Sequence, residues 1–76
     1  MIPNEFIEIT LPRDNQKSLV SISSIALIEK VPNGWTRILL KEKDTQGNNF
    51  FVDTITKYDA IKDEIDKYQK KLQKDN

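Results

Sequence analysis

Residues 25–43 read IALIEKVPNGWTRILLKEK, in which two largely apolar runs flank the tripeptide Pro32-Asn33-Gly34. Residues that favour strands occur in both runs: isoleucine and valine in the first, and isoleucine, threonine and tryptophan in the second. Proline, asparagine and glycine are the residues that tight turns require. The pattern therefore predicts two antiparallel strands, over residues 25–31 and 35–43, joined by a hairpin turn.

The turn of this hairpin has two possible lengths. A two-residue turn made of Asn33 and Gly34 would place Glu29 opposite Ile38, which pairs a charge with an apolar side chain. A three-residue loop lets Pro32 occupy the first corner of a type I turn and Gly34 the left-handed bulge position. The longer loop pairs Glu29 with Arg37, Ile28 with Ile38, Leu27 with Leu39 and Val31 with Trp35. Because matched cross-strand pairs stabilise a sheet, the side chains favour the three-residue loop.

The remaining sequence predicts further strands over residues 5–11, 18–22 and 49–53, with turn-forming residues between them. Residues 56–73 predict one amphipathic helix, because Thr56 to Asp59 has the form of a capping box and an apolar stripe follows at helical spacing. That stripe contains Tyr58, Ile61, Ile65, Tyr68 and Leu72. The 76 residues thus predict a single α+β domain, a small twisted antiparallel β-meander of about five strands followed by one C-terminal helix.

The composition excludes several classes of site. The chain contains no cysteine and no histidine, so it cannot form a disulfide, and it lacks the ligands that zinc, copper and iron sites usually need. No serine, threonine or carboxylate lies in a motif typical of nucleophilic or acid–base catalysis, and the two glycines do not form a phosphate-binding loop. We therefore expect no catalytic residue, no metal and no cofactor.

The charge balance bears on partners and location. Lysine and arginine together number 12, as do aspartate and glutamate, so the formal net charge is zero. A neutral chain is a poor candidate for a free-standing nucleic-acid binder. Residues 1–10 lack the basic start and apolar run of a signal peptide, and no stretch approaches the roughly 20 apolar residues of a membrane span. We expect a cytoplasmic protein without a membrane segment or a small-molecule substrate.

Two strands of the predicted meander carry apolar residues on both faces. Residues 38–40 and 50–52 are uninterrupted apolar runs, which are typical of strands buried on both sides. One face, with Ile28, Ile38 and Leu40, can pack under the helix. The other face forms a candidate interface that contains Leu27, Val31, Trp35, Arg37, Leu39 and Phe50.

Two interpretations of this second face remain open at this point. A strongly twisted sheet can curl until the meander closes on itself and buries both faces. Alternatively, the second face stays exposed and meets another copy of the chain or a larger protein, which is what large exposed apolar patches usually indicate. Trp35 and Arg37 are of the residue types enriched at binding hot spots, which favours an interface.

Several segments together resemble a known family. Residues 7–10 (IEIT), 25–33 (IALIEKVPN) and 47–52 (GNNFFV), with the closing helix, are similar to the small swarming-motility proteins of bacterial flagellar operons. In that family the central motif is Ile-Glu-x-x-Pro-Asp, which residues 28–33 match with asparagine in place of aspartate. The chain departs from the pattern in a longer turn over residues 12–17, in Trp35 and in the lysine-rich tail. The resemblance implies the fold and a small accessory protein, and it carries no functional residue over to this chain.

These observations favour a non-enzymatic interaction module that forms a homo-oligomer or binds a larger protein. The alternative is a weak nucleic-acid-binding accessory domain, with Trp35 as a stacking platform beside a basic helix end. The basic residues of that helix end are Lys67, Lys70, Lys71 and Lys74. They also complement the negative end of the helix dipole, so nucleic acid is the less favoured partner.

Overall fold

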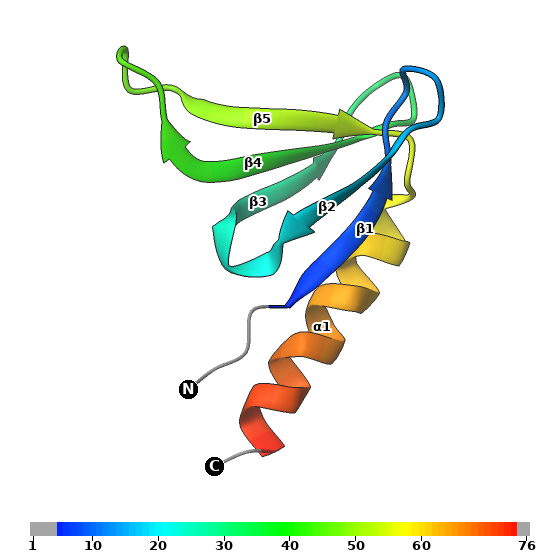
Figure 1. The fold of residues 1–76 in the computed structure, drawn as a ribbon, viewed down its shortest axis with the longest axis vertical. Helices are drawn as coiled ribbons and strands as arrows, with labels where there is room; N and C mark the ends of the chain where they lie inside the picture. The colour runs from blue at the N-terminus through cyan, green and yellow to red at the C-terminus, as the bar shows by residue number, and fades with distance from the viewer. Residues whose placement is uncertain (1–4, 75–76) are drawn as a thin grey trace.

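The computed structural model of the chain describes residues 5–74, and the side chains of residues 5–70 (Figure 1). Its elements in chain order are β1 (Phe6–Thr10), β2 (Lys17–Ser21), η1 (Ile22–Ser24), β3 (Ile25–Lys30), β4 (Thr36–Lys43), β5 (Asn49–Thr54) and α1 (Tyr58–Lys74). Each strand and the helix begin and end within two residues of the bounds that the sequence predicts. The α+β class is confirmed.

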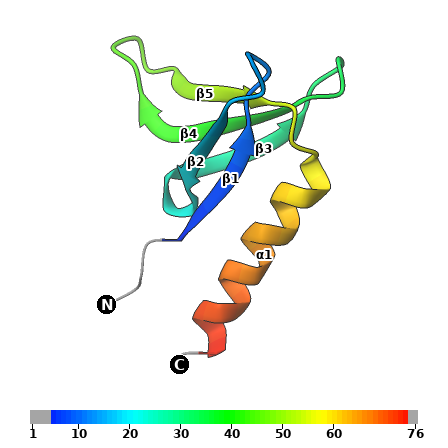
Figure 2. The same ribbon diagram turned by 45° about the vertical axis from the view of Figure 1, so that its right-hand side comes forward.

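The five strands form two antiparallel sheets rather than one continuous meander. A two-stranded sheet contains β1 and β2, and a three-stranded sheet has the order β3-β4-β5. The short 3-10 helix η1, at the Ser23-Ser24 pair, redirects the chain between the two sheets. Figure 2 shows that β1 and β2 lie across the three-stranded sheet, while α1 begins beside the end of β5 and runs away from that sheet.

The hairpin between β3 and β4 has the three-residue loop and the register that side-chain pairing predicts. Leu27 faces Leu39, Ile28 faces Ile38 and Glu29 faces Arg37. The Gly34 N–H donates to the Val31 carbonyl at 3.0 Å, and Gly34 has a φ of +91°, the left-handed conformation of the bulge position. The Val31 N–H then donates to the Trp35 carbonyl at 3.1 Å, which closes the ladder.

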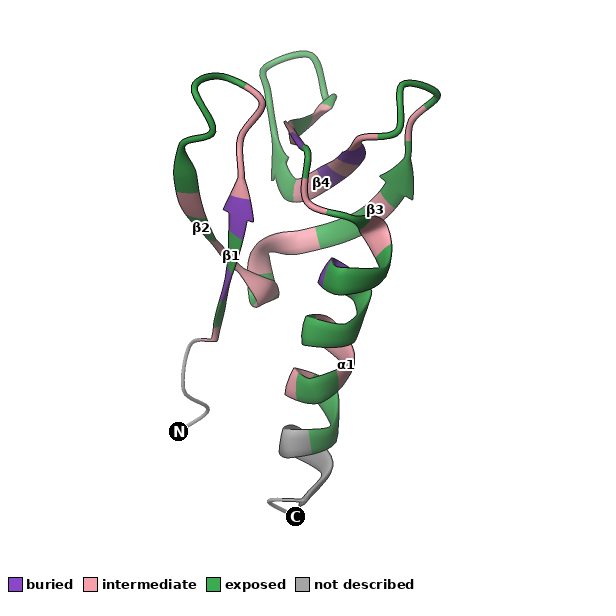
Figure 3. Ribbon diagram, turned by 90° about the vertical axis from the view of Figure 1, so that its right-hand side faces the viewer, coloured by how far each residue is buried: buried purple, intermediate pink, exposed green. Residues whose placement is uncertain are grey.

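The core is small and lies between the two sheets and the first turns of the helix (Figure 3). Among the described residues, the buried apolar side chains are four isoleucines: Ile7, Ile9, Ile38 and Ile61. Ile7 and Ile9 alternate along β1, Ile38 comes from the centre of β4, and Ile61 comes from α1. Partly buried residues surround them, namely Leu11, Val20, Ile22, Ile25, Ile28, Leu40, Val52 and Ile65. The Leu72 position of the predicted helix stripe lies outside the described side chains.

A cluster of four threonines, Thr10, Thr36, Thr54 and Thr56, joins both sheets to the start of the helix. The Thr54 hydroxyl donates to the Thr10 carbonyl at 2.6 Å and accepts from the Thr56 N–H at 3.0 Å. The Thr56 hydroxyl accepts from the Thr10 N–H at 2.9 Å, and the Thr36 hydroxyl donates to the Thr56 carbonyl at 2.8 Å. Thr36 and Thr54 are fully buried, so their hydrogen bonds replace those that water would make.

The threonine cluster overturns the predicted capping box. The Thr56 hydroxyl accepts a hydrogen bond from the Thr10 N–H at the end of β1, so it does not cap the helix. The helix begins at Tyr58, and the first intrahelical bond runs from the Ile61 N–H to the Lys57 carbonyl at 3.1 Å. Lys57 therefore occupies the N-cap position, and the tertiary hydrogen bond prevails over the local one.

Replacing Thr54 by valine tests the threonine cluster, because valine keeps the shape of the side chain and removes the hydroxyl. We expect the free energy of unfolding to fall by about 1–3 kcal/mol, since the Thr10 carbonyl and Thr56 N–H lose a buried partner. Urea denaturation followed by Trp35 fluorescence measures the change. Thr54→Ser should recover part of the loss, and Thr45→Val, in the exposed β4–β5 turn, serves as the matched control. Equal stability of Thr54→Val and wild type would contradict this role.

Candidate interaction surface

An exposed apolar row crosses the outer face of the three-stranded sheet. The register places Leu27 of β3 beside Leu39 of β4, and Leu39 beside Phe51 of β5. Leu27 is 53% exposed and Phe51 is 55% exposed, whereas Leu39 between them is half-buried. Neighbouring strand positions alternate between faces, so Ile38 and Val52 point to the core and the row points to solvent. We call Leu27, Leu39 and Phe51 the apolar row.

A charged row lies next to the apolar row on the same face. Arg37 stands between Glu29 and Asp53 in the sheet register. Its guanidinium binds the Asp53 carboxylate through two bonds, from Nε to Oδ1 at 2.8 Å and from Nη2 to Oδ2 at 3.2 Å. The hydrogen bond with Asp53 raises the pKa of Arg37, and the charges of Asp53 and Glu29 act in the same direction. The two hydrogen bonds to Asp53 hold the guanidinium of Arg37 in one orientation.

Arg37 also contacts the apolar row. Its guanidinium carbon lies 4.4 Å from the centroid of the Phe51 ring, within the range of a cation–π interaction. The bidentate bond to Asp53 sets the plane of the guanidinium, so a single carboxylate orients the cation against the ring. Arg37, Asp53 and Phe51 thus hold one another in place on the outer face of the sheet.

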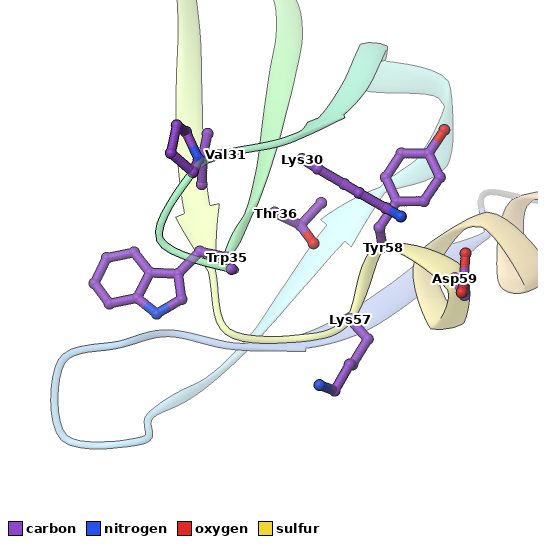
Figure 4. Close-up of a pocket in the computed structure, with 9 residues that line it drawn as sticks. Lys30, Val31, Trp35, Thr36, Lys57, Tyr58 and Asp59 are labelled. Atoms are coloured by element: carbon purple, nitrogen blue, oxygen red, sulfur yellow. The ribbon is translucent and has the colours of Figure 1, made fainter.

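The register places most of the predicted interface residues on the outer face of the three-stranded sheet. Leu27, Arg37 and Leu39 share one face with Phe51, a residue that the sequence analysis did not include. Val31 and Trp35 pair at the hairpin end of this face, two positions beyond Glu29 and Arg37, and they also line a cavity of about 280 Å³ with Lys57 and Tyr58 at the helix start. Figure 4 shows the Trp35 indole and the Tyr58 ring on opposite sides of this cavity.

Phe50, which the sequence analysis placed in the interface, lies next to Phe51 in β5, and its part in an interface stays a prediction. Phe50 precedes Phe51 in β5, and alternation turns it to the side opposite the apolar row, where it is 52% exposed. The β4–β5 ladder is irregular there, because its register shifts between Leu39 and Lys43. The Asn49 side-chain amide donates to the Leu40 carbonyl at 2.6 Å within this irregular segment. The signal that could have identified Phe51 is the residue of β5 that pairs with Leu39.

The structure excludes one of the two interpretations of the second sheet face. The β1–β2 hairpin and α1 cover the inner face, where Ile38 is completely buried. The chain does not curl over the outer face, because Leu27 and Phe51 each keep more than half of their surface exposed. Closure of the meander over both faces is therefore excluded.

The nucleic-acid alternative required Trp35 beside the basic end of the helix. Trp35 instead shares a cavity with Lys57 and Tyr58, at the opposite end of α1 from Lys70 (Figure 1). Lys67 forms an exposed ion pair with Glu64, with 3.5 Å between Nζ and Oε1. The side chains of Lys71 and Lys74 lie outside the described residues. The stacking platform and the basic helix end do not form one surface.

Comparison of the chain with protein-family models, with curated proteins and with solved structures finds no match. The resemblance to the swarming-motility family thus stays a prediction. Over the described residues, no group of three or more histidine, cysteine, aspartate or glutamate residues could hold a metal ion. No helix within residues 5–74 has the length and apolar character that a membrane span requires.

Two alanine substitutions test which face of the sheet is buried. Ile38→Ala should lower the free energy of unfolding by about 2–5 kcal/mol, because it leaves a cavity in the small core. Leu27→Ala, on the outer face of the neighbouring strand, should lower it by about 1 kcal/mol or less. Urea denaturation of both proteins provides the comparison. A larger loss for Leu27→Ala than for Ile38→Ala would contradict the assignment of the two faces.

Proposed function

We propose that the protein is a non-enzymatic, self-associating interaction module that uses the outer face of the β3-β4-β5 sheet. The observation that carries the proposal is the apolar row, which crosses all three strands and leaves Leu27 and Phe51 more than half exposed. Exposed apolar side chains that form a contiguous patch are a common feature of protein–protein interfaces.

The size of the core supports a second copy as the partner. A chain of 76 residues buries a modest share of its surface and has no disulfide to stabilise it. Association of two copies would remove the apolar row from water on both, and each Å² of apolar surface buried contributes roughly 25 cal/mol. Oligomerisation is one of the usual means by which such small domains gain stability.

The geometry of the apolar row suits a two-fold arrangement. A two-fold axis that runs along the row superimposes Leu27, Leu39 and Phe51 on their own copies and inverts the strand direction. The row is therefore complementary to itself in apolarity.

Light scattering over a tenfold range of protein concentration tests self-association. We expect wild type to have the mass of a dimer or larger, and Leu39→Asp to give a folded monomer, because a carboxylate in the apolar row would be buried without a partner. Trp35→Ala, at the hairpin end of the same face, should also weaken association.

The matched control is Leu19→Asp, which introduces the same change at a leucine that is 64% exposed on β2, away from the three-stranded sheet. It should leave the mass of the assembly unchanged. A wild type that is monomeric at every concentration, or equal dissociation by Leu39→Asp and Leu19→Asp, would contradict the proposal.

A further inference from the structure

Among the described residues, strand β1 has one edge that no other strand covers. It pairs with β2 alone, in a register that sets Ile7 opposite Val20. Beyond the strand ends, the Ile22 N–H donates to the Glu5 carbonyl at 3.0 Å and the Leu11 N–H donates to the Gln16 carbonyl at 2.8 Å. Backbone groups alternate in direction along an antiparallel strand. The odd-numbered residues of β1 therefore turn their N–H and carbonyl groups to β2, and the even-numbered ones turn theirs to the free edge.

The threonine cluster occupies only one end of this free edge. The Thr10 N–H donates to the Thr56 hydroxyl at 2.9 Å, and the Thr10 carbonyl accepts from the Ile55 N–H at 3.0 Å. Phe6 and Glu8 have no such partner among the described residues. They therefore present two N–H and two carbonyl groups, in the spacing that pairs with one further strand.

A groove runs along this free edge, between β1 and α1. Figure 3 shows α1 on the side of β1 that is opposite to β2. The groove has a volume of about 360 Å³, and its walls are Phe6 and Glu8 of β1 and Ala60 and Glu64 of α1. A second hollow of about 110 Å³ shares Phe6 and Glu64 and continues toward Tyr68. Ile61 lines the groove from the core side.

We propose that this groove binds an extended peptide segment of alternating basic and small apolar residues, which adds to β1 as a third strand. Addition of a strand to a free sheet edge is a common mode of peptide recognition, in which backbone bonds give affinity and side-chain pockets give specificity. The free groups of Phe6 and Glu8 supply the backbone bonds. The groove is separate from the apolar row, so this proposal does not depend on self-association.

The alternation of the peptide follows from the two sides of β1. Glu8 and Phe6 project from the outer side of the β1–β2 sheet, and Ile7 projects to the core. A peptide residue opposite Glu8 shares its side, where a lysine can bind the carboxylate and lie over the Phe6 ring. The next peptide residue points toward Ala60 and Ile61, where a valine fits and a charge would be buried unpaired. Glu64, which forms an exposed ion pair with Lys67, adds a second carboxylate at the rim.

The test uses the acetylated, amidated peptide Lys-Val-Lys-Val-Lys as the probe, with fluorescence anisotropy of a labelled form and amide NMR shifts as readouts. We expect saturable binding, with shifts centred on Phe6, Glu8, Ala60 and Glu64. Two further peptides carry N-methyl groups on either the lysine or the valine amides. Because only alternate amides of an added strand face β1, one methylated peptide should bind about tenfold more weakly than the other.

Charge reversal locates the peptide on the protein. Glu64→Lys should weaken binding about tenfold, whereas Glu42→Lys, the same change at an exposed position of β4, should leave it unchanged. Leu39→Asp should bind the peptide like wild type, which separates this site from the dimer face. The proposal is overturned if binding is not saturable or if both methylated peptides bind equally. It is also overturned if Glu64→Lys and Glu42→Lys weaken binding equally, or if the NMR shifts lie on the apolar row.

Discussion

The hydrogen bonds of Thr54 are the constraint on which the rest of the structure depends. One buried hydroxyl contacts the end of β1 and the segment that leads into α1, and Thr36 fixes the same segment to β4. The two sheets share no ladder, so these bonds set how the β1–β2 hairpin lies over the three-stranded sheet. The four buried isoleucines can pack together only when that arrangement holds. Polar contacts at the end of the strands thus position an entirely apolar core.

Much of the fold was predictable because the deciding interactions are local. The β3–β4 register follows from Pro32 and Gly34, whose backbone preferences select the loop, and from the pairing of Glu29 with Arg37. The helix stripe placed Ile61 correctly on the buried side. The two-sheet arrangement was not predictable in the same way, since it depends on bonds between residues more than 40 positions apart, such as Thr10 and Thr54.

In the candidate surface, too, local pairings were predictable and long-range ones were not. Leu27, Arg37 and Leu39 share one face because they belong to one local hairpin, whose register the sequence predicts. Phe51 was missed in favour of Phe50 because two adjacent phenylalanines give no pattern of alternation, and only the β4–β5 register assigns each to a face. Thr56 was misread for a related reason. Its sequence neighbours suit a helix cap, but the Thr10 N–H from a distant strand takes its hydroxyl.

The separation of 44 residues between Thr10 and Thr54 has a consequence for how the chain folds. Each hairpin closes a short loop, whereas the threonine cluster closes one that contains most of the strands, and the entropic cost of closure rises with loop length. An isolated hairpin is at best marginally stable in water. Closure of this one large ring therefore unites two weak hairpins and a helix into a single cooperative unit. Contact order, rather than chain length, is then expected to set the folding rate of this small domain.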